Sequence, residues 1–392
     1  MRRAFKTRLK VNDRTATILS QWCGCARLAY NTCLAQWNDM YRQGLKPNYY
    51  AVKKWFNSIK RERFPFIMDV SKWAVEAAVK DLSDAFGRLF RKQNRHPKFH
   101  KKGAHDSFRI DGSVVRVEGN KVCLPKKLTL TMHERFRYEH IATKIYNVTV
   151  SHRAGYWFIS ITCEIPDMVR ENQAKRAVGI DLGVKELATC SDGTVIANPK
   201  TLRKRERRKK HLQRALARKQ HGSKNRQKAR NKLARYEYHT ACKRYDWLHK
   251  HTTRIANENS VVFMEDLNVR GMLANHSLAK SISDASFGEI TRQLSYKTTV
   301  RKIDRYYPSS KKCSQCGAVQ DMPLSARTYE CPSCGLVMDR DMNAAVNILH
   351  VGMANYPELM PVEDDNHQTG QPVLAPREAG IKTSTRKGLN KF

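Results

Sequence analysis

The spacing of apolar positions changes twice in the first part of the chain, and each change predicts a different kind of structure. Residues 5–11 (FKTRLKV) alternate apolar and basic side chains, a period of two that is typical of a half-buried strand. From residue 13 to about residue 90 the apolar side chains recur at spacings of three and four, which predicts helices with basic outer faces. After a basic break at 95–102 the period returns to two.

Two β-hairpins are predicted after this break. One spans residues 114–125 around the turn Gly119-Asn120, and the other joins residues 146–150 to residues 157–162. A single strand must find partners elsewhere, so the N-terminal strand is expected to complete a small β-barrel with these hairpins. The predicted boundaries are 1–12 and 104–170 for the barrel and 13–103 for a helical domain inserted into it.

A second region begins near residue 176 and again starts with strands. Residues 177–196 predict a three-stranded meander whose first strand ends at Asp181. Residues 200–258 are helical and strongly basic, and residues 260–265 return to an apolar strand. The sequence therefore predicts a multidomain protein of α/β and β type. The further boundaries are 175–304 and 339–355 for the second domain, 305–338 for a cysteine-containing insert and 366–392 for a disordered tail.

The charge balance indicates the class of partner. The chain has 73 Lys and Arg against 36 Asp and Glu, a net charge of +37. Such an excess of positive charge indicates a polyanionic partner, such as nucleic acid. A membrane surface is the alternative polyanion. However, no apolar run approaches the roughly 18 residues of a membrane-spanning helix, and the N-terminus lacks the apolar segment of a signal peptide. We expect a cytoplasmic nucleic-acid-binding protein without membrane contact.

Three acidic residues stand at positions that suit a two-metal phosphodiester hydrolase. Asp181 and Glu265 each end an apolar strand, and Asp341 opens the helical pattern 342–349. Adjacent strands would bring the first two together, and carboxylate oxygens are suitable ligands for two Mg²⁺ ions about 3.5–4 Å apart. Each residue alone also has an ordinary explanation, as a turn residue, a strand end or a helix N-cap. Their combination in a strongly basic chain favours a catalytic site.

Four of the eleven cysteines form two short pairs. Cys313-x-x-Cys316 and Cys331-x-x-Cys334 are separated by 14 residues, slightly fewer than the usual spacing of about 15–20. Four thiolates suit tetrahedral Zn²⁺ and leave no open position for water, so we expect a structural zinc ribbon. It lies between the second and third acidic residues in the sequence and is expected to position the third. The other seven cysteines are expected to be small buried hydrophobes.

Several motifs follow one another in a fixed order over the chain up to about residue 350. They are RLAYNTCLAQWN (27–38), GYWFISITCEIP (155–166), GIDLG around Asp181, MEDL around Glu265, SISDASFGEITRQLSYK (281–297), KKCSQCG (311–317), YECPSCG (329–335) and DRDMNAAVNI (339–348). Together they resemble the TnpB family of insertion-sequence proteins, which are relatives of the type V CRISPR effectors.

The resemblance implies an RNA-guided DNA endonuclease, encoded by a transposable element, that cuts double-stranded DNA next to a short flanking motif. It implies an RNase H-like (RuvC) nuclease domain with an inserted zinc ribbon, and a β-barrel wedge domain with an inserted helical recognition domain. The family's third acid precedes x-Asn-Ala-Ala, which selects Asp341 over the runner-up Asp339, for which helix capping is the alternative role. The expected partners are target DNA and a guide RNA, with one protein per guide RNA, at the nucleoid of a prokaryotic cell.

Basic residues between 200 and 235 are the predicted contacts to guide RNA or a duplex, and a solvated helix face is the ordinary alternative. By resemblance, the helical domain and the barrel read the flanking motif, although Trp73 also fits the apolar stripe of its helix. Arg327 and Tyr329, between the cysteine pairs, are candidate nucleic-acid contacts, with simple packing as the alternative. The predicted nucleic-acid contacts are Tyr50, Lys53, Lys72, Trp73, Glu76, Arg203, Arg207, Arg208, Lys224, Arg226 and Arg327.

Two other functions stay open from the sequence. One is a guide-RNA-bound, DNA-binding repressor that does not cut, against which the intact set of three acids argues. The other is an unguided transposase-type nuclease or a resolvase. A transposase would not need the helical insert in a β-barrel, and a resolvase would have no evident use for the zinc ribbon.

Overall fold

The computed structural model describes residues 1–166, 176–323 and 326–359, which form two compact units. One unit contains residues 1–166, 197–253 and 268–293, and the other contains residues 176–196, 254–267 and 294–359. The predicted disordered tail at 366–392 lies outside the described residues. No helix within the described ranges is both long and apolar enough to cross a bilayer.

An antiparallel sheet of seven strands lies at the centre of the first unit. Its order is β2-β6-β7-β1-β5-β4-β3. The N-terminal strand pairs with β7 of the second predicted hairpin, as expected, and on its other side with β5, a strand that was not predicted. The two predicted hairpins are present as β3–β4 and β6–β7. The strands are β1 (Arg2–Lys10), β2 (Ser107–Asp111), β3 (Arg116–Glu118), β4 (Lys121–Leu124), β5 (Leu128–Met132), β6 (Lys144–Arg153) and β7 (Tyr156–Glu164), with the short helix η2 (Gly112–Val114) after β2.

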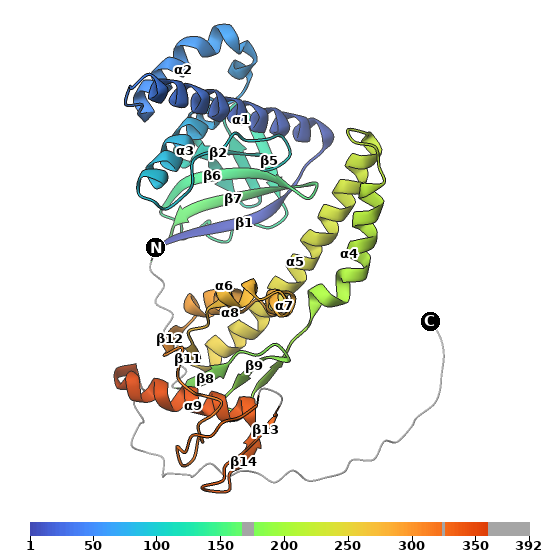
Figure 1. The fold of residues 1–392 in the computed structure, drawn as a ribbon. Helices are drawn as coiled ribbons and strands as arrows, with labels where there is room; N and C mark the ends of the chain where they lie inside the picture. The colour runs from blue at the N-terminus through green and yellow to red at the C-terminus, as the bar shows by residue number, and fades with distance from the viewer. Residues whose placement is uncertain (167–175, 324–325, 360–392) are drawn as a thin grey trace. The chain divides into compact units, whose positions relative to one another are not determined.

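The helices predicted between residues 13 and 90 pack together against this sheet (Figure 1). Two of them begin at an asparagine cap, because the side chain of Asn12 accepts the amide of Thr15 and that of Asn48 accepts the amide of Ala51. The apolar stripes meet in one core, in which Trp37 stacks on a phenylalanine ring of the third helix at 4.4 Å between centroids. The helices are α1 (Asp13–Arg42), α2 (Tyr49–Arg63), η1 (Pro65–Asp69) and α3 (Lys72–Phe90).

The strongly basic segment is helical, as predicted, and forms two long helices. They are α4 (Thr201–Ala217) and α5 (Lys224–Glu258), which run side by side (Figure 1). The Tyr236 hydroxyl donates to the Arg205 carbonyl across the pair, at 2.9 Å. The buried carboxylate of Asp284 accepts the amides of Leu202 and Arg203 at the start of α4. Three shorter helices follow: α6 (Val269–Ala274), α7 (Ala279–Ala285) and α8 (Phe287–Ser295).

The second unit is built on a mixed five-stranded sheet with the order β10-β9-β8-β11-β12. Its first three strands form the predicted meander, and β11 pairs in parallel with both β8 and β12. Because β8 and β11 are parallel neighbours, their carboxyl ends meet at the same edge of the sheet. The strands are β8 (Ala177–Asp181), β9 (Glu186–Cys190), β10 (Val195–Ala197), β11 (Val261–Glu265) and β12 (Thr299–Ile303).

Helix α9 (Arg340–Asn355) packs against this sheet (Figure 1). Its contact with β8 is close, since a Cβ atom at Gly179 would lie 2.2 Å from the Ala345 carbonyl oxygen. Ile348 of the helix is fully buried beside Phe263 of β11. The remaining elements are β13 (Thr328–Glu330) and β14 (Val337–Asp339), which pair with each other before α9, and η3 (Pro357–Leu359) after it.

Candidate functional site

Asp181, Glu265 and Asp341 come together at one edge of the five-stranded sheet. Asp181 is the last residue of β8 and Glu265 the last residue of β11. The register places Met264 opposite Ile180, so the two acids follow at neighbouring positions. Asp341 lies in the first turn of α9, which packs on the same strands. The expectation that adjacent strands bring the first two acids together is confirmed.

The pKa of Asp181 indicates that the three acids are close enough to interact electrostatically. The pKa of its carboxyl is raised from the ordinary 3.8 to about 7, chiefly by burial and next by the negative charges of Glu265 and Asp341. The Arg340 guanidinium and the Leu182 amide act in the opposite direction. Three half-buried acids that repel one another are unfavourable without a cation, so this arrangement suits divalent ions.

The three carboxylates lie farther apart than the four cysteines described below. Among the described residues, the cysteines below are the only group of possible ligands whose atoms all lie within 4.8 Å of one another. The three carboxylates are therefore more widely spaced than a cage for one ion.

Asp339 and Asp341 have different positions at the start of α9. Asp339 is the N-cap, and its Oδ1 accepts the amides of Asp341 at 2.9 Å and of Met342 at 3.1 Å. Its carboxylate thus neutralises the free amides of the first turn. The role that the sequence left open for Asp339, a helix cap, is the one the structure contains.

We predict that the repulsion among these acids makes the ion-free protein pH-sensitive. The pKa of Asp181 is about 7 in the folded protein, whereas an unfolded Asp titrates near 3.9. The folded protein therefore holds a proton that the unfolded chain has released, and its stability falls as the pH rises between these values, by up to about 4 kcal/mol. In buffer freed of Mg²⁺ but without a chelator that removes zinc, Asp181→Asn should melt at a higher temperature than the native protein at pH 8, with the difference disappearing toward pH 4. A difference of the same size at both pH values would contradict the assignment.

The four predicted zinc ligands converge in the second unit. Their sulfur atoms lie within 4.8 Å of one another, with Cys313 3.6 Å from Cys334 and Cys316 3.5 Å from Cys331. A tetrahedral ion with Zn–S bonds of about 2.3 Å would place its sulfurs about 3.8 Å apart. The cluster therefore fits zinc, and four thiolates close the coordination sphere, as a structural site requires.

The two candidate nucleic-acid contacts inside the ribbon, one aromatic and one basic, differ in exposure. Tyr329 is fully buried, and its hydroxyl donates to the Lys311 carbonyl at 3.2 Å. The suggestion that Tyr329 contacts nucleic acid is therefore wrong, because the ribbon uses this ring as its own core. Arg327 is exposed, and its role as a contact stays a prediction.

The other predicted nucleic-acid contacts lie in the first unit, on helices α2 to α5. Tyr50 is 80% exposed at the start of α2. Lys53 forms an ion pair of 3.3 Å with Glu76, so neither charge is free in this structure. Trp73 is partly buried against the core, in line with the packing alternative, and the Lys72 ammonium lies over its ring.

Charges on the two long basic helices are only partly available. Arg203, Arg207, Arg208 and Lys224 are exposed. Arg226, by contrast, donates to two carbonyls at the end of α4, 2.7 and 3.2 Å away, and thereby joins the helices. Its fork geometry suits this capping role.

A basic groove between β1 and α5 was not predicted. It has a volume of about 880 Å³ and lies within the first unit. Strand residues 5, 7 and 9 are buried in the core, which turns Lys6 and Arg8 to the other face. On α5 the lining positions 238, 242, 245 and 249 recur at helical spacing. Its lining combines cations and aromatic rings and includes Lys6, Arg8, Arg137, Arg153, Phe158, Tyr238, Tyr245 and His249. It also contains two acids, Asp246 and Glu134, and the latter is ion-paired with Arg137 at 3.8 Å.

This groove also corrects one expectation. Cys242 lines it and is exposed, so the interpretation of the scattered cysteines as buried hydrophobes is wrong for this residue. Cys123 is half-buried, and the other five are buried. The repeating lining positions on α5 were the signal available in the sequence, but they carry no meaning until β1 is known to lie opposite.

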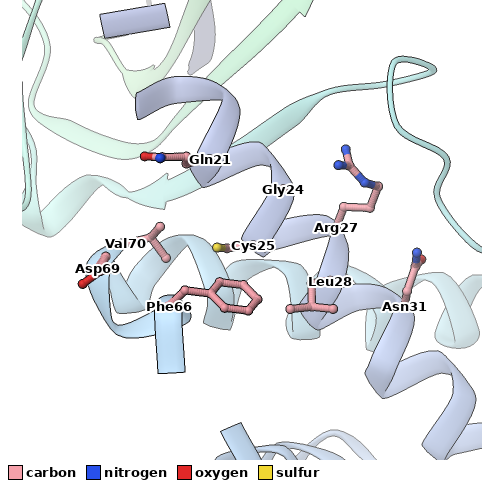
Figure 2. A pocket seen from close by; sticks show the side chains of 9 residues that line it. All are labelled: Gln21, Gly24, Cys25, Arg27, Leu28, Asn31, Phe66, Asp69 and Val70. Atoms are coloured by element: carbon pink, nitrogen blue, oxygen red, sulfur yellow. The ribbon is translucent and has the colours of Figure 1, made fainter. Parts of the chain in front are cut away.

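A second hollow in the first unit has a different character. Figure 2 shows it between α1 and η1, with the Phe66 ring beside Cys25 and Leu28. Its volume is about 530 Å³, and its lining includes one basic residue, Arg27. Arg27 is ion-paired with Asp106 at 2.6 Å. This mostly apolar hollow therefore lacks the free positive charge that nucleic acid requires, unlike the basic groove.

Three family models match successive parts of the chain. A helix-turn-helix domain model of the OrfB group of IS605-type elements matches residues 1–46, although these residues form β1 and a single 30-residue helix here. The OrfB model of the same group, described as a probable transposase, matches residues 160–276. The model of the Cas12f1-like TNB domain matches residues 287–348.

Curated relatives match over most of their length. The chain is 38% identical over 368 residues to a Streptomyces pristinaespiralis protein, covering 90% of each chain. It is 31% identical over 378 residues to InsQ of Escherichia coli K12, covering 90% of this chain and 92% of that one. Both are named as candidate RNA-guided DNA endonucleases.

Two solved structures share the fold. One is Cas12f1 in complex with sgRNA and target DNA, with a TM-score of 0.54, 16% identity, and coverage of 86% of this chain and 83% of that one. The other is the mini RNA-guided endonuclease CRISPR-Casφ3, with a TM-score of 0.51, 8% identity, and coverage of 90% and 92%. The predicted multidomain α/β architecture is thus confirmed at the level of the fold.

Proposed function

The chain belongs to the TnpB family of insertion-sequence proteins, and we propose on this basis that it is an RNA-guided DNA endonuclease. The observation that carries the nuclease assignment is the convergence of Asp181, Glu265 and Asp341, in which the charges of the last two help to raise the pKa of the Asp181 carboxyl. Phosphodiester hydrolysis requires such a cluster of hard oxygen ligands. The proposed substrate is double-stranded DNA that matches the guide and lies next to a short flanking motif.

In the proposed mechanism, Asp181, Glu265 and Asp341 would hold two Mg²⁺ ions at the edge of the five-stranded sheet. Bound Mg²⁺ would supply an activated water and neutralise charge on the scissile phosphate. The parallel strand ends fix the backbone of Asp181 and Glu265, and the first turn of α9 fixes that of Asp341. Arg340 lies close enough to Asp181 to lower its pKa, so it offsets part of the repulsion among the acids.

We assign the architecture in the family's terms. The mixed sheet, with an antiparallel meander followed by parallel strands, supports an RNase H-like (RuvC) nuclease domain at 175–304 and 339–355. The zinc ribbon is 305–338. The seven-stranded sheet supports a wedge domain at 1–12 and 104–170, with the helical recognition domain, 13–103, inserted after β1.

The proposed partners are a guide RNA and target DNA, with one protein per guide RNA. In guide-directed systems, base pairing reads the sequence while the protein holds the backbone. The net charge of +37 and the basic groove support this division of labour. The exposed ring of Tyr245 suits stacking of an unpaired base, and the cations of the groove suit the adjoining phosphates.

Purification from cells that carry the native locus tests this function. We expect a defined RNA to co-purify, and we expect the complex to cut DNA matching that RNA only when Mg²⁺ is present. Bound RNA without cutting would support the repressor. Cutting without RNA would support the unguided transposase-type nuclease.

A salt titration tests the groove. Lys6→Ala should weaken binding of the co-purifying RNA by about three- to tenfold and reduce the slope of log affinity against log salt by about one, because one phosphate contact is lost. Arg61→Ala is the matched control, an exposed basic residue on α2 outside the groove. Equal effects of both substitutions would mean that the groove has no special part in binding.

A further inference from the structure

A short turn joins the zinc ribbon to the acidic cluster. Residues 308–312 run from β12 toward the first zinc ligand, and Ser309 in this turn is only 5% exposed. Its hydroxyl donates to Oε1 of Glu265 at 2.5 Å. Such a short bond to a carboxylate is charge-assisted and stronger than a neutral one. Ser309 therefore restrains the side chain of the second acid, not that of the third.

Helix α9 holds the turn in place through two asparagines. Asn347 donates to the Ser309 carbonyl at 2.8 Å and to the Lys312 carbonyl at 2.7 Å. Asn343 donates to the same Lys312 carbonyl at 2.7 Å, and its Oδ1 accepts the Ser314 amide at 3.0 Å. Both asparagines are at most 2% exposed and lie four residues apart, on one face of the helix.

The second half of the ribbon contacts the same turn. The Tyr329 hydroxyl donates to the Lys311 carbonyl at 3.2 Å. Arg340, which is 9% exposed, donates to the carbonyls of Pro323 and Ala326 and to the Ser310 hydroxyl, the last at 3.4 Å. The turn is thus fixed between the ribbon and the helix that carries Asp341.

We propose that Ser309 is a positioning residue that orients the Glu265 carboxylate for divalent ions, and that the ribbon and α9 hold Ser309 there through Asn343 and Asn347. This inference rests on the proposed function of the acidic cluster. A carboxylate has about four lone-pair sites, so one hydrogen bond leaves others for ions. The hydroxyl acts by selecting one orientation of Glu265, and the ribbon thereby contributes to the geometry of the second acid.

Direct ion binding tests the proposal in the full-length, zinc-loaded protein. Mn²⁺ binding, followed by electron paramagnetic resonance of the free ion, should be about 10- to 100-fold weaker in Ser309→Ala, the usual effect of losing a residue that orients a metal ligand. The Mg²⁺ concentration for half-maximal cutting should rise by a similar factor. The zinc content and the melting temperature should stay close to native values.

Ser314→Ala is the matched control. This serine lies in the same ribbon, but its hydroxyl contacts the Met338 sulfur and not an acid. It should bind Mn²⁺ like the native protein. Asn347→Ala should show the same direction of change as Ser309→Ala, because it loosens the turn without touching Glu265.

Two results would overturn the proposal. One is native Mn²⁺ affinity in Ser309→Ala, and the other is a loss of zinc from this variant in proportion to its loss of Mn²⁺, which would make the serine merely structural. Failure of the proposed function gives a different result. In that case the native protein would bind no Mn²⁺, or would bind it with an affinity that Asp181→Asn leaves unchanged.

Discussion

Asp181→Asn should abolish DNA cutting, by about 10³-fold or more, and leave RNA binding and guided target binding intact. The substitution keeps the shape of the side chain and removes its negative charge, and with it a central ligand for the proposed ions. Losing metal-based stabilisation of the transition state is worth several kcal/mol, which corresponds to a rate change of this size. The measurement is single-turnover cutting at saturating complex, with binding followed separately by gel shift.

Unfolding would not explain the loss of cutting in Asp181→Asn. Since the native carboxyl is buried among like charges, the amide is expected to stabilise the ion-free fold above pH 7. Asp192→Asn is the matched control, because Asp192 is an exposed turn residue between β9 and β10 whose side chain accepts the Thr194 amide. It should cut normally. A cutting rate of Asp181→Asn within tenfold of native would remove Asp181 from the site.

Cys313→Ser should release the zinc and, with it, most of the cutting activity. The free energy of binding a structural zinc contributes directly to folding, so losing one ligand should unfold the ribbon. The melting temperature of the protein should fall by on the order of 10 °C. The turn that holds Glu265 and the start of α9 both contact the ribbon. Metal analysis, melting and cutting assays should therefore change together, while RNA binding in the other compact unit is preserved.

Cys123→Ser provides the comparison for this substitution. Cys123 is a half-buried cysteine on β4, outside the cluster. Its replacement should leave one zinc per chain and native cutting. If Cys313→Ser retained zinc and cut at the native rate, the ribbon would not be the structural site assigned here.

Local patterns were sufficient to predict the elements that carry the acids. Asp181 and Glu265 each follow a run of apolar residues, and such runs predict strands buried on both faces, which the structure contains as β8 and β11. The four cysteines were predictable because two Cys-x-x-Cys pairs close in sequence are typical of a zinc site, and their sulfurs converge in the structure. Only the family resemblance favoured Asp341 over Asp339 as the third acid of the site. The structure adds a physical reason, since Asp339 is used by the helix cap.

Features that depend on contacts between distant segments were not predictable. The basic groove joins β1 to α5, more than 200 residues later, and neither segment contains a sign of the other. Ser309 lies in a turn without periodicity, so its bond to Glu265 follows only from the packing of α9. Tyr329 was misjudged because a small ribbon needs a core of its own, and the aromatic ring supplies it. The roles of the predicted nucleic-acid contacts stay predictions.

Guide exchange is the most direct test of the central claim. The complex is assembled with the co-purifying RNA after only its guide segment has been replaced, and it is offered a DNA that carries both the old and the new target beside the same flanking motif. We predict that cutting moves entirely to the new target, requires Mg²⁺ and is absent from Asp181→Asn. Cutting that stays at the old target, or that continues without RNA, would contradict an RNA-guided nuclease.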